Sequence, residues 1–197
     1  MLRILPYPHP ALRYESRPVI QIDDELRGFV REMFDLMYAA RGVGLAANQV
    51  GLPYRFFILN LTADPEKKEE EQVFINPEIV KRHASVENEE GCLSFPGLYT
   101  NVRRAKKIKF QAFDLQGNIL QKEADDLFGR AFQHETDHLS GRLFIDTLGP
   151  LAQHSVKPKL REFEKSFRAA QAAGEYPSDE DIVRQLDAMN QPAAVSR

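Results

Sequence analysis

The sequence contains one cysteine, no tryptophan and no long hydrophobic run. A single cysteine excludes an internal disulfide and favours a reducing compartment, so we expect a cytoplasmic protein. The longest apolar runs are too short to cross a bilayer, which requires about 20 apolar residues, so no membrane association is expected. Prolines interrupt residues 1–19, and the segment lacks the apolar stretch that is typical of a signal peptide.

The chain also lacks a strong charge of either sign. Its 26 Lys and Arg residues and 29 Asp and Glu residues give a formal net charge of −3. This balance excludes the globally basic surface of many nucleic-acid-binding proteins, so we expect no recognition of a specific nucleic-acid sequence. With 43% hydrophobic residues, the 197-residue chain is long enough to bury a core as one domain.

Hydrophobic periodicity predicts helices and strands without a regular alternation of the two. Residues 23–42 have apolar residues at three- and four-residue spacings, which predicts an amphipathic helix capped by Asp23 or Asp24. A second helix is expected from Asp125 or Asp126 to Gly141, and a third after Pro158. Strands are expected at 54–61, 73–80, 107–115 and 119–124. This mixture predicts an α+β fold.

The stretch QHETDHLSG, residues 133–141, places His134 and His138 four residues apart. On a helix both imidazoles lie on one face and can reach one metal ion, and Glu135 then lies where a carboxylate can take a proton from water. An ordinary core histidine explains either one alone, but the pair beside Glu135 indicates a metal-dependent hydrolase. Two imidazoles leave a tetrahedral catalytic ion in need of one more protein ligand and a water.

Two regions of the sequence offer a third ligand. A protease would use Glu162 or Glu164, although both stand within an amphipathic pattern, where solvated carboxylates are the ordinary interpretation. Upstream, Cys92 lies in EGCLSFPG, where glycine and proline favour an irregular loop between two expected strands. Its thiolate would complete a Cys and two-His site with an open position for water, whereas a buried, inert thiol is the alternative.

A third stretch, RGVGLAANQVG at residues 41–51, contains the pattern G-x-G-x-x-A. A dinucleotide-binding fingerprint needs a strand before it, but the preceding residues have helical periodicity, which disfavours that interpretation. We interpret the stretch as a tight segment whose small residues present Gln49. The Gln49 amide could donate a hydrogen bond to an oxyanion, and an exposed surface glutamine is the alternative.

Together, GVGLAANQVG, EGCLSFPG and QHETDHLSG resemble the three signature motifs of peptide deformylases, G-x-G-x-A-A-x-Q, E-G-C-[LS]-S and Q-H-E-x-D-H-x-x-G. The order and spacing also agree, and the resemblance extends from about Ile4 to Ala170. It implies an α+β fold in which mixed or antiparallel sheets pack around a central metal-binding helix, with helices toward both termini. It also implies removal of the N-formyl group from the N-terminal formylmethionine of nascent polypeptides, with release of formate.

The resemblance further implies roles for individual residues. The implied metal ligands are Cys92, His134 and His138. Glu135 would be the general acid/base for attack by a metal-bound hydroxide, and the Gln49 side chain and the Leu93 backbone N–H would hold the oxyanion. The implied substrate-binding residues are Val43, Gly44, Gly97, Leu127 and Ala131. The implied cofactor is one divalent ion per chain, usually Fe(II), with Zn(II), Ni(II) or Co(II) able to replace it.

Three further expectations concern the periphery of the site and the tail. Residues 1–174 are expected to form one catalytic domain, and residues 175–197 a polar C-terminal extension that is partly helical or disordered. Arg130 stands where many relatives have an apolar residue, and a helix arginine turned toward solvent is the simplest interpretation. Basic residues of the third helix are candidates for a transient contact with the ribosome: Lys157, Lys159, Arg161, Lys165 and Arg168.

Overall fold

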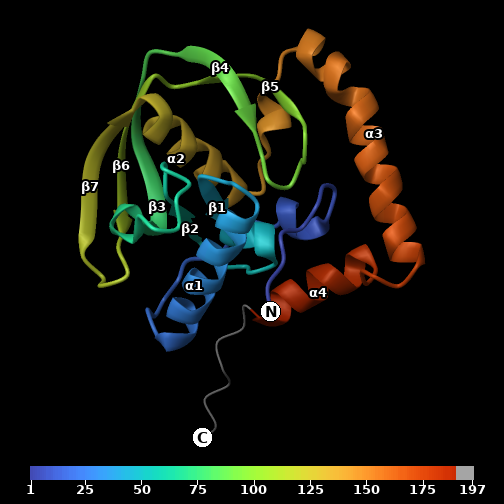
Figure 1. The fold of residues 1–197 in the computed structure, drawn as a ribbon, viewed down its shortest axis with the longest axis horizontal. Helices are drawn as coiled ribbons and strands as arrows, with labels where there is room; N and C mark the ends of the chain where they lie inside the picture. The colour runs from blue at the N-terminus through green and yellow to red at the C-terminus, as the bar shows by residue number, and fades with distance from the viewer. Residues whose placement is uncertain (190–197) are drawn as a thin grey trace, which may run out of the picture.

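The computed structural model describes residues 1–189 and confirms the α+β expectation. A five-stranded antiparallel sheet has the order β1-β2-β3-β6-β7, and β4 and β5 form a separate two-stranded sheet. Helix α2 lies between these two sheets, α1 packs on the other side of β1 and β2, and α3 runs along one edge of the molecule (Figure 1). The two strands of the small sheet lie beside the middle of α2.

The expected strands are all present, with shifted ends. They correspond to β2 (Phe56–Leu59), β3 (Gln72–His83), β6 (Lys107–Phe113) and β7 (Ile119–Asp125). The remaining strands are β1 (Gly44–Ala46), β4 (Val86–Gly91) and β5 (Tyr99–Arg104). The short 3-10 helices are Pro10–Arg13, Ala47–Val50, Lys68–Glu70 and Phe144–Thr147. Cys92 therefore lies directly after β4, in the connection between the two strands of the small sheet.

The first two expected helices are confirmed as α1 (Asp24–Ala39) and α2 (Asp126–His138). The Asp23 carboxylate caps α1 by accepting a hydrogen bond of 2.9 Å from the Leu26 backbone N–H. After α2, the chain turns at Gly141, where φ is +66° and a side chain would collide with the Arg13 carbonyl. Glycine at this position lets the chain leave α2 close to the N-terminal segment.

The buried face of α2 packs on the large sheet through aromatic rings. The ring centroid of Phe132 lies 4.1 Å from that of Phe110, 5.0 Å from that of Phe57 and 5.1 Å from that of Phe74. Contacts of this kind contribute about 0.5–1.5 kcal/mol per pair beyond the area they bury. They fix the rotation of α2 about its axis and hence the direction in which the histidines of the next turn point.

The start of the third helix was predicted wrongly. Helix α3 spans Pro150–Ala172, so Pro158 lies inside the helix rather than before it. Pro150 occupies the first turn, where its missing N–H costs no hydrogen bond. Val156, Leu160 and Phe163 form one stripe across Pro158 and pack against the core. The packing of this stripe outweighs the loss of one helical hydrogen bond at the proline.

A fourth helix, α4 (Asp179–Met189), lies within the predicted polar extension. Its Ile182 and Leu186 side chains are each 4% exposed and belong to the core cluster that includes Leu12 from the N-terminal segment. The division of the chain at residue 174 stays a prediction, and residues 190–197 lie outside the described part. Within residues 1–189, no helix combines the length and apolar character needed to cross a membrane.

The packing of α4 predicts an effect on stability. Replacing the buried Leu186 by Ala should lower the free energy of unfolding by about 2–5 kcal/mol, because it leaves a cavity in the core. Val183 on the same helix is 39% exposed, and its replacement by Ala should change stability by no more than about 0.5 kcal/mol. Urea unfolding measures both, and equal effects of the two substitutions would contradict the packing.

Candidate metal centre

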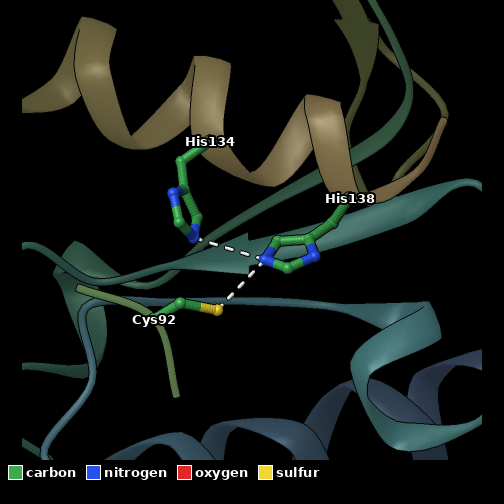
Figure 2. A group of neighbouring side chains, drawn as sticks. All are labelled: Cys92, His134 and His138. Carbon is green, nitrogen blue, oxygen red and sulfur yellow. Dashed lines mark hydrogen bonds between the residues drawn. The ribbon is translucent and has the colours of Figure 1, made fainter. Parts of the chain in front are cut away.

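Two histidines of α2 and the cysteine that follows β4 converge on one point (Figure 2). The His138 Nε2 atom lies 3.2 Å from His134 Nε2 and 3.3 Å from Cys92 Sγ. One ligand atom from each of the three residues lies within 4.8 Å of the others. The fold therefore brings Cys92 to the two histidines, which lie more than 40 positions further along the chain.

The donor atoms fit a divalent metal ion. Metal–sulfur bonds of about 2.3 Å and metal–nitrogen bonds of about 2.0 Å in a tetrahedron place neighbouring ligand atoms about 3.3–3.6 Å apart. The observed separations of 3.2 and 3.3 Å are close to these values. Burial lowers the pKa of His138 well below its ordinary value, which keeps that imidazole neutral and able to ligate. For His134, contacts with Cys92 and Glu90 outweigh burial and raise the pKa to about 10, so metal binding would displace a proton from that imidazole.

Glu135 lies beside this group with one carboxylate oxygen, Oε2, buried and without a hydrogen-bond partner among the described residues. Burial raises its pKa to about 7, although the charges of His134 and Arg104 lower it. A carboxyl group in this range can both accept and return a proton near neutral pH. Gly44 makes room for it, because a Cβ atom there would lie 2.5 Å from Glu135 Oε1.

Gln49 is buried, so the alternative of a surface glutamine is wrong. Its Oε1 accepts a hydrogen bond of 2.9 Å from the Ala46 backbone N–H, which fixes the orientation of the amide. The Nε2 atom then faces the metal centre, donating to Ser94 Oγ at 3.1 Å and to Cys92 Sγ at 3.4 Å. The backbone N–H of Leu93 has no hydrogen-bond partner within residues 1–189. The Leu93 N–H can therefore donate to a substrate oxygen, and the Gln49 amide would exchange its long contact to Cys92 Sγ for one to that oxygen.

Sequence reasoning missed a buried carboxylate behind the ligands. Glu90 Oε2 lies 3.1 Å from His134 Nδ1, and the Arg104 guanidinium donates to both Glu90 oxygens, at 2.8 and 2.9 Å. Burial favours the neutral acid, but the hydrogen bonds from His134 and Arg104 outweigh it and lower the pKa of Glu90 to about 2. The ionised carboxylate orients the imidazole so that its Nε2 atom faces the other ligands. The signal was present as the glutamate of EGCLSFPG.

A cleft of about 510 Å³ opens onto the metal centre. The five sequence-predicted substrate-binding residues all line it: Val43, Gly44, Gly97, Leu127 and Ala131. Cys92, His134, Glu135 and Gln49 form its floor. Leu127 is 53% exposed at its mouth, and Tyr99 lies over Gly91, where any side chain would collide with the tyrosine ring. The cleft thus presents apolar surface beside a polar reacting centre.

Two alternatives from the sequence are not supported. Glu162 and Glu164 are exposed on α3. Glu162 pairs with Lys159, and Glu164 accepts a hydrogen bond from the Tyr7 hydroxyl. Neither belongs to the metal-ligating group found within residues 1–189. The expectation that Arg130 turns toward solvent is wrong, because its side chain is buried and ion-paired with Glu90.

Comparison with known proteins gives consistent matches along the chain. Residues 1–154 match the family model described as polypeptide deformylase. A peptide deformylase of Rhodopirellula baltica is 41% identical over 184 residues, which are 93% of this chain and 91% of that protein. One from Neisseria meningitidis is 42% identical over 165 residues, covering 84% of this chain and 97% of that protein.

Solved structures agree with these sequence matches. A peptide deformylase structure from Plasmodium falciparum has a TM-score of 0.82 at 40% identity and covers 85% of this chain and 98% of that one. A plant peptide deformylase structure has a TM-score of 0.83 at 38% identity and covers 90% of this chain and 95% of that one.

The geometry predicts that metal binding depends on Cys92 and not on α3. Cys92→Ala should weaken metal affinity by at least ~100-fold. Losing a residue that only hydrogen-bonds to a ligand costs up to about 100-fold, and losing a ligand itself should cost no less. Glu162→Ala serves as the control and should retain the wild-type metal content. Elemental analysis of anaerobically purified proteins measures both and also identifies the native ion. Full metal occupancy in Cys92→Ala would contradict this ligand set.

Proposed function

The chain belongs to the polypeptide deformylase family, whose activity is the removal of the formyl group from nascent peptides, and we propose which of its residues carry that reaction. Cys92, His134 and His138 hold the metal ion. The observation that carries this assignment is the convergence of one ligand atom from each of the three residues within 4.8 Å, beside a cleft that Cys92 and His134 line. A Cys and two-His group is a metal-binding arrangement with room for a fourth position.

Glu135 moves the proton. When bound, a divalent ion supplies Lewis acidity and lowers the pKa of water in the site. The Glu135 carboxylate, buried beside the histidines, accepts a proton from that water and returns it to the leaving amine. Its pKa of about 7 is raised by burial, so the group exchanges a proton in both directions at neutral pH. Gly44 keeps the space in which it does so.

Gln49 and Leu93 stabilise the charge that develops on the formyl oxygen. The Gln49 amide is held by the hydrogen bond that its Oε1 accepts from the Ala46 N–H, so its Nε2 can exchange the 3.4 Å contact to Cys92 Sγ for the formyl oxygen without rotating. The Leu93 N–H follows Cys92 directly in the chain and supplies a second donor. Fixed donors of this kind are effective because they are already aimed where negative charge appears.

The cleft receives the methionine side chain and the following residues of the substrate. Val43, Leu127 and Ala131 supply apolar contacts beside the metal ligands. Gly97, with φ at +73° and open space at its Cβ position, leaves the opposite wall free for an extended peptide. A formylated N-terminus can therefore reach the centre only when the chain that follows lies along the cleft.

Fe(II) is the metal that we propose for this site, with one ion per chain. A thiolate and two imidazoles suit several first-row metals, and this ligand set alone does not discriminate against Zn(II), Ni(II) or Co(II). Availability in a reducing cytoplasm, where the single thiol of Cys92 stays reduced, favours Fe(II). A native ion other than iron after anaerobic purification would overturn this choice.

Glu135→Gln tests the proton transfer. The amide keeps the size of the side chain but cannot accept the proton, so kcat for formate release from formyl-Met-Ala-Ser should fall by ~10²–10⁴-fold. Metal content should remain at the wild-type level, because Glu135 is not among the three ligands. Glu162→Gln on the exposed face of α3 is the matched control and should leave kcat unchanged. A Glu135→Gln protein with near wild-type kcat would remove Glu135 from the mechanism.

We also propose a transient contact with the ribosome through α3, which runs along the edge of the molecule (Figure 1). Its exposed basic residues include Lys157, Arg161 and Lys165. Reversing these three charges to Glu should reduce co-sedimentation with ribosomes at low salt, since the attraction is electrostatic and screened by salt. Formate release from a short peptide should not change. Unaltered co-sedimentation of the variant would contradict this proposal.

A further inference from the structure

Arg130 is a buried arginine of α2 that no step of the proposed reaction uses. Its side chain is 9% exposed, and its guanidinium spans the β4–β5 hairpin. Nη1 donates to Glu90 Oε1 at 2.5 Å and to the Val102 carbonyl at 3.0 Å, and Nη2 donates to the Val86 carbonyl at 3.2 Å. The Asn88 carbonyl lies 3.5 Å from Nη1. One side chain of α2 therefore binds both strands of the hairpin.

The apolar contacts of the hairpin are not with α2: Val102, and Phe95 and Leu98 of the β4–β5 connection, belong to a core cluster that contains no residue of α2. β4 and β5 pair only with each other, and an isolated two-stranded hairpin is at best marginally stable in water. Within the two strands themselves, the buried side chains are Glu90, Val102 and Arg104. Two of these three are charged and form ion pairs with residues of α2 or with each other. The contacts of the hairpin strands with α2 are thus polar, whereas the β4–β5 connection is held by the apolar core.

These contacts bear directly on the metal ligands. Strand β4 ends at Gly91, directly before Cys92, so a movement of the end of β4 relative to α2 would be passed on to Cys92. The Sγ atom lies only 3.3 Å from His138 Nε2. A displacement of about 1 Å would be a large fraction of a metal–ligand bond length of about 2.0–2.3 Å.

Arg130 also selects which oxygen of Glu90 meets the imidazole. Glu90 Oε1 accepts from Arg130 Nη1 at 2.5 Å and from Arg104 Nε at 2.8 Å. The other oxygen, Oε2, accepts from Arg104 Nη2 and lies 3.1 Å from His134 Nδ1. With Oε1 occupied by two guanidinium groups, Oε2 is directed to His134, whose Nε2 atom then faces Cys92 and His138.

The charges of this buried cluster are balanced only when Arg130 is included. Arg104 pairs with Glu90 and with Asp137, and its Nη1 lies 2.5 Å from Asp137 Oδ2. Two carboxylates would then share one guanidinium. Arg130 supplies a second positive charge, so buried Glu90 and partly exposed Asp137 each have a cationic partner. An unpaired buried charge is costly, and the cluster would relax toward solvent without it.

We propose that Arg130 is a positioning residue of the metal centre: it clamps the β4–β5 hairpin to α2, and through Glu90 it orients His134. Through the hairpin it influences the position of Cys92, and through Glu90 it influences the orientation of His134. This inference rests on the proposed ligand set, and it assigns to Arg130 no contact with the reacting atoms.

Arg130→Leu tests the clamp, because leucine keeps apolar bulk and removes every donor. The metal affinity of the folded apo-protein, measured by competition with a chelator, should fall by ~10–100-fold, as is typical when an outer partner of a ligand is lost. The thiolate-to-metal absorption of the Co(II) form should weaken as the Cys92 bond lengthens. Arg103→Leu is the matched control, since Arg103 lies on the same hairpin with its side chain 72% exposed. It should leave both readouts unchanged.

Arg130→Lys keeps the charge but loses the fork of donors, so it can satisfy only part of the acceptor set. It should bind metal with an affinity between those of wild type and Arg130→Leu. If Arg130→Leu does not fold, the metal affinity of Arg130→Lys alone tests the proposal. Wild-type metal affinity in a folded Arg130 variant would overturn the proposal, even if thermal stability fell. A wild-type protein that binds no metal would instead refute the proposed function itself.

Discussion

The ionised carboxylate of Glu90 is the interaction on which the rest of the metal centre depends. It joins the two parts of the chain that supply ligands, because it belongs to β4, just before Cys92, and accepts hydrogen bonds from Arg104 and from the His134 side of α2. Helix α2 is itself fixed against the large sheet by the Phe132 ring stack. The aromatic core thus fixes the positions of the two histidines, and Glu90 fixes the position of the hairpin that carries Cys92 relative to them.

Such a buried charge is stable only because it is fully paired. Removing a carboxylate from water costs several kcal/mol, and breaking one partner of a buried pair typically costs about 3–5 kcal/mol. Burial favours the neutral acid, but hydrogen bonds from His134 and Arg104 hold Glu90 ionised and lower its pKa to about 2. Glu135 of α2, the residue after His134, has no such partner for Oε2, and burial raises its pKa to about 7. The two carboxylates therefore have different roles: Glu90 stays ionised and orients His134, and Glu135 carries the proton.

Much of this site could be predicted from local sequence, because a helix converts four-residue spacing into a shared face. That rule brought His134 and His138 together, and small residues around Gln49 indicated a presented amide. The network of Glu90, Arg104 and Arg130 could not be predicted in the same way, since its members meet only through the packing of a hairpin on a helix. The start of α3 was predicted wrongly for a related reason. The apolar stripe of the helix continues across Pro158, and its packing against the core stabilises the helix despite the proline.

The most direct test is a titration of Fe(II) into anaerobic apo-protein, with formate release from a formylated peptide and bound metal measured on the same samples. Because one Cys and two-His group is present within residues 1–189, formate release should rise in proportion to bound iron and reach its plateau at about one ion per chain. Formate release by metal-free protein, or its absence at full occupancy, would contradict a reaction carried out at this centre.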